Sequence, residues 1–188
     1  MGVALRSSRI FTLLFCAGFS FAVSTPSKLA FLFITKATFP LARVWEDYFA
    51  TASRDQFSIY VHGPPGFLLN ETTTDAPLFW GRTVSNSVLV GWGELSLVEA
   101  EMLLYAAALE DKENAWFILL SDTTLPIRTF SFTYAYAMGA KLTFISVDEW
   151  PDMARYNNDF DPRIIPRDAW KKGAQWAMCV SFCKGLCH

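Results

Sequence analysis

Residues 115–127, AWFILLSDTTLPI, constrain the fold more than any other part of the chain. The apolar run over 116–120 is too short for a typical helix and is rich in strand-forming residues, which predicts a fully buried, parallel strand. The run stops at the small polar residues 121–124, and Pro126 prevents further ladder pairing. Open α/β sheets place ligands just past the carboxyl ends of such strands. The stretch therefore indicates either a ligand site or a plain strand followed by a turn.

A strand–helix–strand unit lies upstream. Residues 28–35 and Phe57–His62 have the composition of strands, and between them Pro40 opens a helix in which apolar residues recur at helical spacing. The crossover of such a unit is right-handed in nearly all proteins. Because its two strands are parallel, we expect Thr35 and Lys36 to lie at the same edge of the sheet as His62.

A second unit of the same kind leads into the central strand. Residues 84–91 are predicted to form a short third strand. Ser96 and Glu99 fit a capping box that opens a helix, whose apolar stripe is expected to face the core. That stripe consists of Leu97, Val98, Met102, Leu103, Ala106 and Leu109. Downstream, the pattern predicts a helix over 129–138 and a strand over 141–147.

Length and composition bound the fold and the kind of partner. A chain of 188 residues has the length of one domain. Hydrophobic residues make up 52% of the sequence and aromatic residues 16%, which is enough to form a core. The net charge of −2 argues against nucleic acid as the main partner, because phosphate binding needs a basic face. The element order predicts an α/β fold with a mostly parallel sheet and flanking helices. It also divides the chain into residues 1–27, an α/β domain over 28–147, and a polar segment over 148–188.

Residues 1–27 have the pattern of a targeting segment. Arg6 and Arg9 precede an apolar run over 10–23, which resembles a signal peptide and is short for a spanning anchor. A small-x-small cleavage motif follows, but a further apolar stretch leaves an uncleaved signal-anchor open. Asn70, in the triplet Asn-Glu-Thr, is a predicted N-glycosylation site and agrees with translocation into the secretory pathway.

Three strand ends are expected to converge on one edge of the sheet. A nucleotide base and ribose need a flat apolar wall and a few hydroxyl partners. Side chains near this edge that offer them are Tyr60, Val61, Ser121 and Asp122. His62 on its own is typical of a hydrogen-bonded structural histidine, but its position at the predicted edge also makes it a candidate for ligand binding.

Two patterns match metal ligands in part. Asp159 and Asp161 form Asp-x-Asp, in which two carboxylates can hold an ion that bridges a diphosphate, but no strand aims them. The second set is Cys179, Cys183, Cys187 and His188. Three residues between each pair of cysteines is not a zinc-knuckle spacing, and thiols of a secretory chain favour disulfides. We therefore expect no metal site.

Aromatic and cationic side chains are combined near the C-terminus. They are Trp170, Lys171, Lys172 and Trp176. Sugars stack on aromatic rings, and lysines can bind hydroxyl or phosphate oxygens. This segment is therefore either a sugar-binding surface or the start of a solvated amphipathic helix.

Five segments together resemble the plant branch of the Core-2/I-branching β-1,6-N-acetylglucosaminyltransferase family. The segments are KLAFLFITKATFPLARVWEDYF, QFSIYVHGPPGF, FWGRTVSNSVLVGWGELSLVEAEMLLYAAAL, WFILLSDTTLPI and ARYN…WKKGAQW. They cover nearly all of residues 28–176 in the expected order.

The resemblance implies a single-pass type II Golgi membrane protein, with a secreted protein as the alternative. It implies a GT-A-like nucleotide-sugar domain over 28–147 and an acceptor-side loop and tail over 148–188. It further implies metal-independent, inverting transfer from a UDP-sugar to a hydroxyl of a glycan or glycoprotein. The residues expected at the donor are Tyr60, Val61, His62, Ser121 and Asp122. Those expected at the acceptor are Lys171, Lys172 and Trp176.

The chain departs from the family pattern at its C-terminus. The resemblance places the catalytic glutamate, and the basic residues that neutralise the diphosphate, beyond WKKGAQW, and this chain ends twelve residues after that segment. We therefore expect an incomplete C-terminal half, a catalytic base beyond His188, and no activity in the chain as written. The alternatives are a non-catalytic product that binds UDP-sugar and a small secreted carbohydrate-binding protein.

Overall fold

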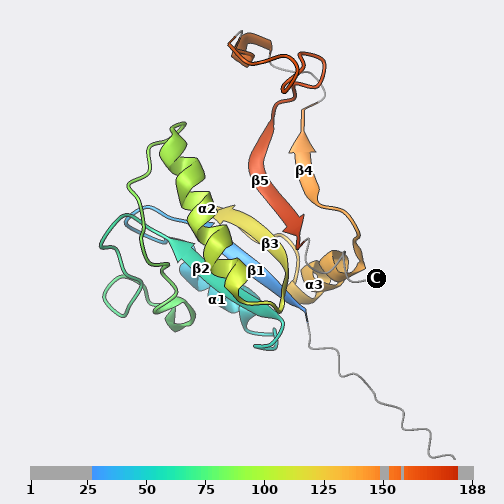
Figure 1. Cartoon of the computed structure of the whole chain (residues 1–188). Coiled ribbons are helices and arrows are strands. Elements are labelled where there is room, and N and C mark those ends of the chain that lie inside the picture. The colour runs from blue at the N-terminus through green and yellow to red at the C-terminus, as the bar shows by residue number, and fades with distance from the viewer. Residues whose placement is uncertain (1–26, 149–152, 158, 182–188) are drawn as a thin grey trace, which may run out of the picture.

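In the computed structural model, which describes residues 27–148, 153–157 and 159–181, five strands form one sheet (Figure 1). The strands are β1 (Lys28–Ile34), β2 (Phe57–His62), β3 (Asn114–Ser121), β4 (Phe144–Val147) and β5 (Gly173–Val180). Their order is β2-β1-β3-β5-β4. β2, β1 and β3 are parallel, whereas β5 runs antiparallel to both β3 and β4. The predicted α/β fold with a mostly parallel sheet is confirmed.

Helices cover both faces of the parallel part of the sheet. Those in the described residues are α1 (Ala42–Phe49), α2 (Leu95–Glu110) and α3 (Phe130–Gly139), with 3₁₀ turns at η1 (Pro77–Phe79) and η2 (Met153–Arg155). α1 and α3 pack on one face and α2 on the other (Figure 1). Because successive side chains of a strand point to opposite faces, β1 must be apolar throughout to face both layers. This requirement explains its sequence, KLAFLFI.

Aromatic rings fill the layer between the sheet and α1. Phe31 of β1 is buried, and its ring lies edge-on to Phe49 at a centroid distance of 4.8 Å and to Trp45 at 5.9 Å. Phe130 at the start of α3 lies 6.4 Å from the same ring. Edge-to-face pairs add to the free energy gained by burial. Phe31 therefore joins the sheet to both helices of this face.

The register aligns the carboxyl ends of the three parallel strands. Ile34 pairs with His62 on one side and with Ser121 on the other. Beyond it, the Thr35 amide donates to the His62 carbonyl at 2.8 Å. The prediction that Thr35, Lys36 and His62 share an edge with the turn after β3 is therefore confirmed.

The predicted strand over 84–91 is wrong. One isolated bridge joins Val61 to Thr83, and the Val84 amide donates to the Val61 carbonyl at 2.8 Å. Beyond it the backbone turns away, since Asn86 takes a φ of 61°. The Val88 amide donates to a side chain, His62 Nε2, at 3.1 Å. This segment is therefore an irregular loop over the end of β2.

The predicted capping box and apolar stripe of α2 are also wrong. The N-cap residue is Glu94, with no side-chain hydrogen bond, and the Ser96 hydroxyl instead accepts from the Gly91 amide at 3.0 Å. The buried residues of α2 are Ala100, Leu104 and Ala108. Val98, Met102 and Leu109 of the predicted stripe are exposed. The helix is apolar around most of its circumference, so periodicity does not single out the face that packs on the sheet.

β5 was not predicted, and the alternative of a helix beginning near Trp170 is wrong. β5 pairs with β3 at Trp116, Phe117 and Ile118 and forms an antiparallel hairpin with β4. Figure 1 shows this hairpin, which we call the β4–β5 arm, extending away from the rest of the sheet. All four residues in the first half of β5 are exposed. The first half of the strand is therefore less buried than β1 and β3.

The predicted targeting segment lies outside the described residues apart from Ser27. Cys183, Cys187 and His188 of the suggested zinc set lie outside them as well. Among the helices of the described ranges, none is long and apolar enough to span a bilayer.

The aromatic layer makes Phe31 the residue whose truncation we expect to cost most. Phe31→Ala removes the ring common to α1, α3 and β1, and should lower the free energy of unfolding by about 3–5 kcal/mol. The control Phe132→Ala truncates an exposed ring of α3 and should change it by no more than about 0.5 kcal/mol. Urea unfolding of both variants measures the difference, and equal effects would contradict this account of the core.

Candidate functional site

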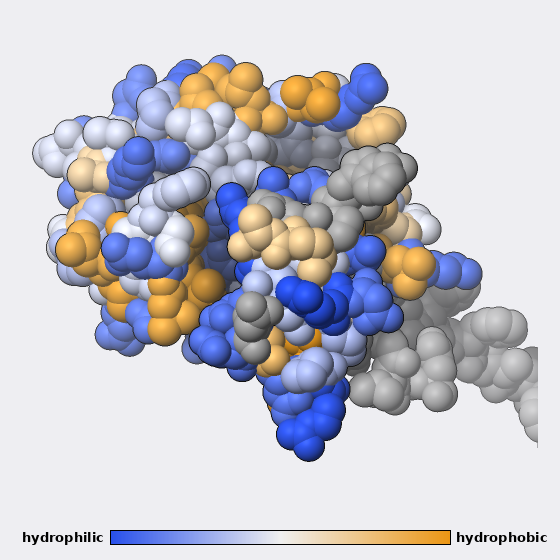
Figure 2. Space-filling model, turned by 90° about the horizontal axis from the view of Figure 1, so that it is seen from above, coloured by the Kyte–Doolittle hydropathy of each residue, from blue (hydrophilic) through white to orange (hydrophobic). Residues whose placement is uncertain are grey.

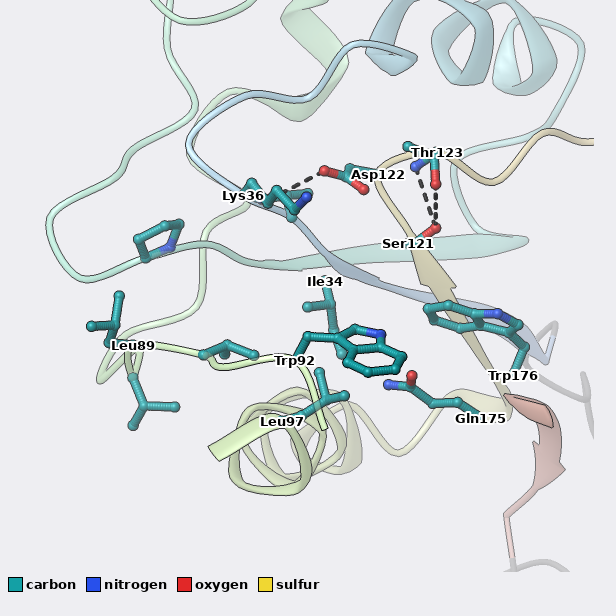
Figure 3. Close-up of a pocket in the computed structure, with 14 residues that line it drawn as sticks. Ile34, Lys36, Leu89, Trp92, Leu97, Ser121, Asp122, Thr123, Gln175 and Trp176 are labelled. Atoms are coloured by element: carbon teal, nitrogen blue, oxygen red, sulfur yellow. Dashed lines mark hydrogen bonds between the residues drawn. The ribbon is translucent and has the colours of Figure 1, made fainter. Parts of the chain in front are cut away.

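A cavity of about 320 Å³ lies past the carboxyl ends of β1 and β3 (Figure 3). Its walls come from the ends of these strands, from the loop before α2, from the first turn of α2 and from β5. The lining residues are Ile34, Thr35, Lys36, Pro64, Val88, Leu89, Val90, Trp92, Leu97, Ser121, Asp122, Thr123, Gln175 and Trp176. The cavity is at the edge where an open α/β sheet binds its ligands.

The ends of β1 and β3 hold Asp122 in place. The Asp122 amide donates to the Ile34 carbonyl at 3.1 Å, and its carboxylate oxygen Oδ2 accepts from the Lys36 amide at 3.4 Å (Figure 3). The carboxylate is thereby fixed between two strand ends at the cavity wall. It is an acceptor at the cavity wall that can receive hydrogen bonds from a ligand, and Lys36 lines the same cavity.

Hydroxyl groups brace the turn that follows β3. The Ser121 hydroxyl lies 3.0 Å from the hydroxyls of both Thr123 and Thr124. The Thr124 carbonyl accepts from Trp45 Nε1 of α1 at 3.0 Å. The turn is therefore tied to the aromatic core, which keeps Ser121 and Asp122 in register with β1.

Apolar groups form the side of the cavity across from these polar ones. Trp92 is 95% exposed and Trp176 is 41% exposed, so neither ring is buried in the apolar core. Figure 3 shows both side chains on the side of the cavity opposite Lys36 and Asp122. Seen from above, the molecule carries several patches of exposed apolar residues among hydrophilic ones (Figure 2). An apolar wall facing a few polar groups is typical of a small-molecule site.

A contact between α2 and β5 supports the Trp176 side of the cavity. Gln175 Nε2 donates to Glu101 Oε1 at 2.6 Å. Burial raises the pKa of the Glu101 carboxyl, and the hydrogen bond from Gln175 opposes this rise. Nearby, the Tyr105 hydroxyl lies 3.9 Å from the Cys179 sulfur, a second contact between the same two elements.

His62 supports the cavity wall from behind. The residue is fully buried, and its Nε2 accepts from the Val88 amide at 3.1 Å. Burial lowers its pKa, because the charged imidazolium is disfavoured away from water. With Nε2 accepting, the proton of the neutral ring is on Nδ1, which has no hydrogen-bond partner in the described part of the chain.

The structure brings together some of the predicted donor residues and separates others. Ser121 and Asp122 line the cavity, whereas Tyr60, Val61 and His62 do not. The Tyr60 hydroxyl accepts from Asn114 Nδ2 at 3.1 Å, and the Val61 side chain is buried in the core. β2 is the edge strand of the sheet, whereas the cavity lies past the ends of β1 and β3, so the side chains of β2 do not reach it.

Of the predicted acceptor residues, Trp176 lines the cavity and the two lysines do not. Lys172 lies where β5 begins, with Nζ 3.5 Å from Asp148 Oδ2, and Lys171 directly precedes it. In the Asp-x-Asp pattern, Asp161 pairs with Arg163 at 2.7 Å. Within the described ranges, no group of three or more His, Cys, Asp and Glu residues is placed to hold a metal ion.

Sequence reasoning missed the apolar lining of the cavity. The predicted strand over 84–91 contained Val88, Leu89 and Val90, and Trp92 followed it directly. Leu97 was placed in the core stripe of the following helix. The available signal was the tryptophan between two glycines, Gly91 and Gly93, because a large aromatic residue in a glycine-flanked turn is hard to bury.

The fold and the cavity define a class of protein. A mostly parallel sheet, covered by helices on both faces and carrying a polar turn at the end of its central strand, is a GT-A-like α/β fold. The model of the Core-2/I-Branching enzyme family matches residues 29–180. The chain belongs to this family, as the five segments of the sequence indicated.

A curated relative agrees with this assignment. "Glycosyltransferase BC10" of Oryza sativa subsp. japonica is 43% identical over 152 residues. The aligned region covers 81% of this chain but 38% of the relative. The chain thus spans less than half the length of that protein.

The buried imidazole of His62 makes stability depend on pH. Its folded pKa is below the ordinary value of 6.5, so below about pH 6.5 the unfolded chain takes up a proton that the folded chain does not. The free energy of unfolding should therefore fall as pH decreases from 7.5 to 5.5, with a His62 contribution of at most about 1.4 kcal/mol per pH unit. The chain has two histidines, so His188→Gln leaves His62 as the one imidazole. Adding His62→Gln should flatten the slope, and an unchanged slope would contradict the assignment.

Proposed function

We propose that the cavity binds the UDP portion of a UDP-sugar and that the chain is the donor-binding part of a glycosyltransferase. The observation that carries the proposal is the position of Asp122, fixed between the ends of β1 and β3 at the binding edge of a chain of this family. The printed name of the rice relative supports the same class of activity.

Each part of the cavity has a role in this proposal. The loop residues Val88, Leu89 and Val90 offer an apolar surface for the flat uracil ring, and His62 holds that loop through Val88. Asp122 and the Ser121 hydroxyl offer partners for ribose hydroxyls. Lys36 supplies a cation on the side where the diphosphate would lie. Tyr60 and Val61 hold β2 in place without reaching the ligand.

The proposed reaction is an inverting transfer to a glycan hydroxyl. A carboxylate takes the proton of the acceptor hydroxyl while its oxygen bonds to the anomeric carbon and the bond from that carbon to UDP breaks. The anomeric carbon passes through an oxocarbenium-like state, as in glycoside hydrolysis. We propose a metal-independent reaction, because the turn after β3 offers one carboxylate, whereas an ion bridging a diphosphate is typically held by more than one.

We further propose that residues 1–188 bind the donor without turnover. Asp122 is the one carboxylate among the described residues that line the cavity, and the proposal assigns it to the ribose. Glu101 lies outside the lining and accepts from Gln175. The described lining therefore offers no further carboxylate to act as the base. The targeting pattern of residues 1–27 and the family support a Golgi location with a single type II membrane segment, and a secreted form is the alternative.

UDP titration tests the donor site. Calorimetry with the recombinant chain should show saturable binding of UDP, and Asp122→Ala should raise the Kd about tenfold or more, because it removes a charged hydrogen-bond acceptor. The control Asp55→Ala removes an exposed carboxylate just before β2, at the opposite end of the parallel strands, and should leave the Kd unchanged.

Two results would contradict parts of this proposal. Equal Kd values for the Asp122→Ala and Asp55→Ala variants would place the UDP site elsewhere. Release of UDP from a panel of UDP-sugars, in the presence of glycan acceptors, would show turnover and contradict the proposed inactivity.

A second candidate function, carbohydrate binding without a nucleotide, is favoured by the exposed Trp92 and Trp176 rings. Under it, Trp176→Ala should weaken binding of a glycan array ligand about tenfold, and UDP should not compete. Phe132→Ala is the control, since Phe132 is 53% exposed and lies outside the cavity. Competition by UDP would favour the glycosyltransferase instead.

A further inference from the structure

A second surface hollow, separate from the donor cavity, lies beside Asn70. It has a volume of about 490 Å³ and shares no lining residue with the first cavity. It is lined by Leu68, Leu69, Asn70, Glu71, Thr72, Trp80, Gly81 and Thr83. The sequence contains a single Asn-x-Ser/Thr triplet, and its asparagine stands at this hollow.

Hydrogen bonds within the triplet occupy the oxygen of the Asn70 amide and not its nitrogen. Oδ1 accepts from the Thr72 amide at 2.9 Å and from the Thr72 hydroxyl at 2.7 Å. The Thr73 hydroxyl accepts from the backbone N–H of Asn70 at 2.9 Å, which fixes the backbone of the loop. Within the described ranges, Nδ2 has no hydrogen bond to a protein atom, and Asn70 is exposed. The folded loop therefore leaves Nδ2 free to carry a substituent.

Two apolar side chains of the hollow are exposed without a role in the core. Leu68 is 62% exposed and Trp80 is 42% exposed. Trp80 Nε1 donates to the Thr74 carbonyl at 3.2 Å, which fixes the orientation of the indole. A pyranose ring has a face rich in C–H groups that packs on such surfaces, as other apolar groups do on aromatic rings.

We propose that Asn70 carries an N-linked glycan and that its first N-acetylglucosamine packs on Leu68 and Trp80. The donor is a lipid-linked oligosaccharyl diphosphate of the secretory pathway. A bond forms between Asn70 Nδ2 and C1 of the sugar, the C1–O bond to the lipid diphosphate breaks, and the diphosphate leaves with the electron pair. Nδ2 loses one proton to the transferase that catalyses the step. The site depends on translocation by the predicted N-terminal segment and is independent of donor binding.

Expression of the full chain in a eukaryotic secretory host tests the modification. Peptide N-glycosidase should increase the mobility of the wild-type chain on a gel and convert Asn70 to aspartate, as detected by peptide mass spectrometry. Asn70→Gln and Thr72→Ala should both abolish the shift. Thr72→Ser, which retains the hydroxyl, should preserve it.

A second asparagine provides the control for exposure to the modifying enzyme. Asn157 accepts from the Asp159 amide through Oδ1 at 2.9 Å, as Asn70 does from Thr72, but residue 159 has no hydroxyl. Asp159→Thr creates a triplet there. A glycan at Asn157 of this variant with an unmodified Asn70 would overturn the proposal. Absence of glycan at both positions would overturn it as well, because the chain then does not reach a glycosylating compartment.

Thermal unfolding tests the packing of the sugar. In the wild type, the glycosylated chain should melt about 2–4 °C above the same chain trimmed by peptide N-glycosidase, the shift expected for one well-packed contact in a chain of this size. The difference should vanish in Trp80→Ala and persist in Trp92→Ala, which truncates an exposed tryptophan outside the hollow. A difference unaffected by Trp80→Ala would show that the glycan does not pack there.

Discussion

Burial of β1 on all sides is the constraint on which the rest of the structure depends. The strand has a hydrogen-bonded neighbour at each edge and a helical layer on each face, so its polar backbone and its side chains are both withdrawn from water. Such a strand is stable only if both ladders are complete and both faces are apolar. These requirements fix the positions of β2 and β3 relative to β1. The same register makes β1, β2 and β3 end side by side, at Ile34, His62 and Ser121.

The common end level of the strands produces the candidate site. Beyond Ile34, which is paired on both sides, the next residues of each strand leave the sheet together. Some backbone N–H groups beyond this point donate to side chains instead of to a neighbouring strand. Asp122 receives the amide of Lys36, and His62 receives the amide of Val88. The loop before α2 and the turn after β3 are thus positioned by the sheet itself. Trp45 of α1 and Ser96 of α2 add one hydrogen bond each to the turn and to the loop.

The sequence was most informative for β1, β2, β3 and α1 and least informative for α2 and β5. β1 and β3 are buried on both faces, so their composition alone predicted them, and the parallel connection predicted the shared edge. α2 is apolar around its circumference, which hides the face formed by Ala100, Leu104 and Ala108. β5 is exposed over its first half and pairs with a strand far away in the sequence, and its apolar residues 176–180 were not recognised as part of a strand. For the site, the polar turn at Ser121 and Asp122 was visible, whereas Trp92 and Gln175 reach the cavity through packing of distant segments.

The short pairing between β3 and β5 has a consequence for how tightly a ligand can be held. Ladder pairs in the described residues join these strands at Trp116, Phe117 and Ile118, so the residues of β3 nearest the cavity do not bind the arm directly. Asp122 therefore follows a strand of the parallel part of the sheet, whereas Trp176 belongs to the arm, which three ladder pairs join to β3 and the Gln175–Glu101 hydrogen bond joins to α2. A molecule that touches both has to fix the distance between them, and this loss of conformational entropy offsets part of its contact energy. The affinity for such a molecule therefore depends on how the arm packs against α2 as well as on the turn after β3.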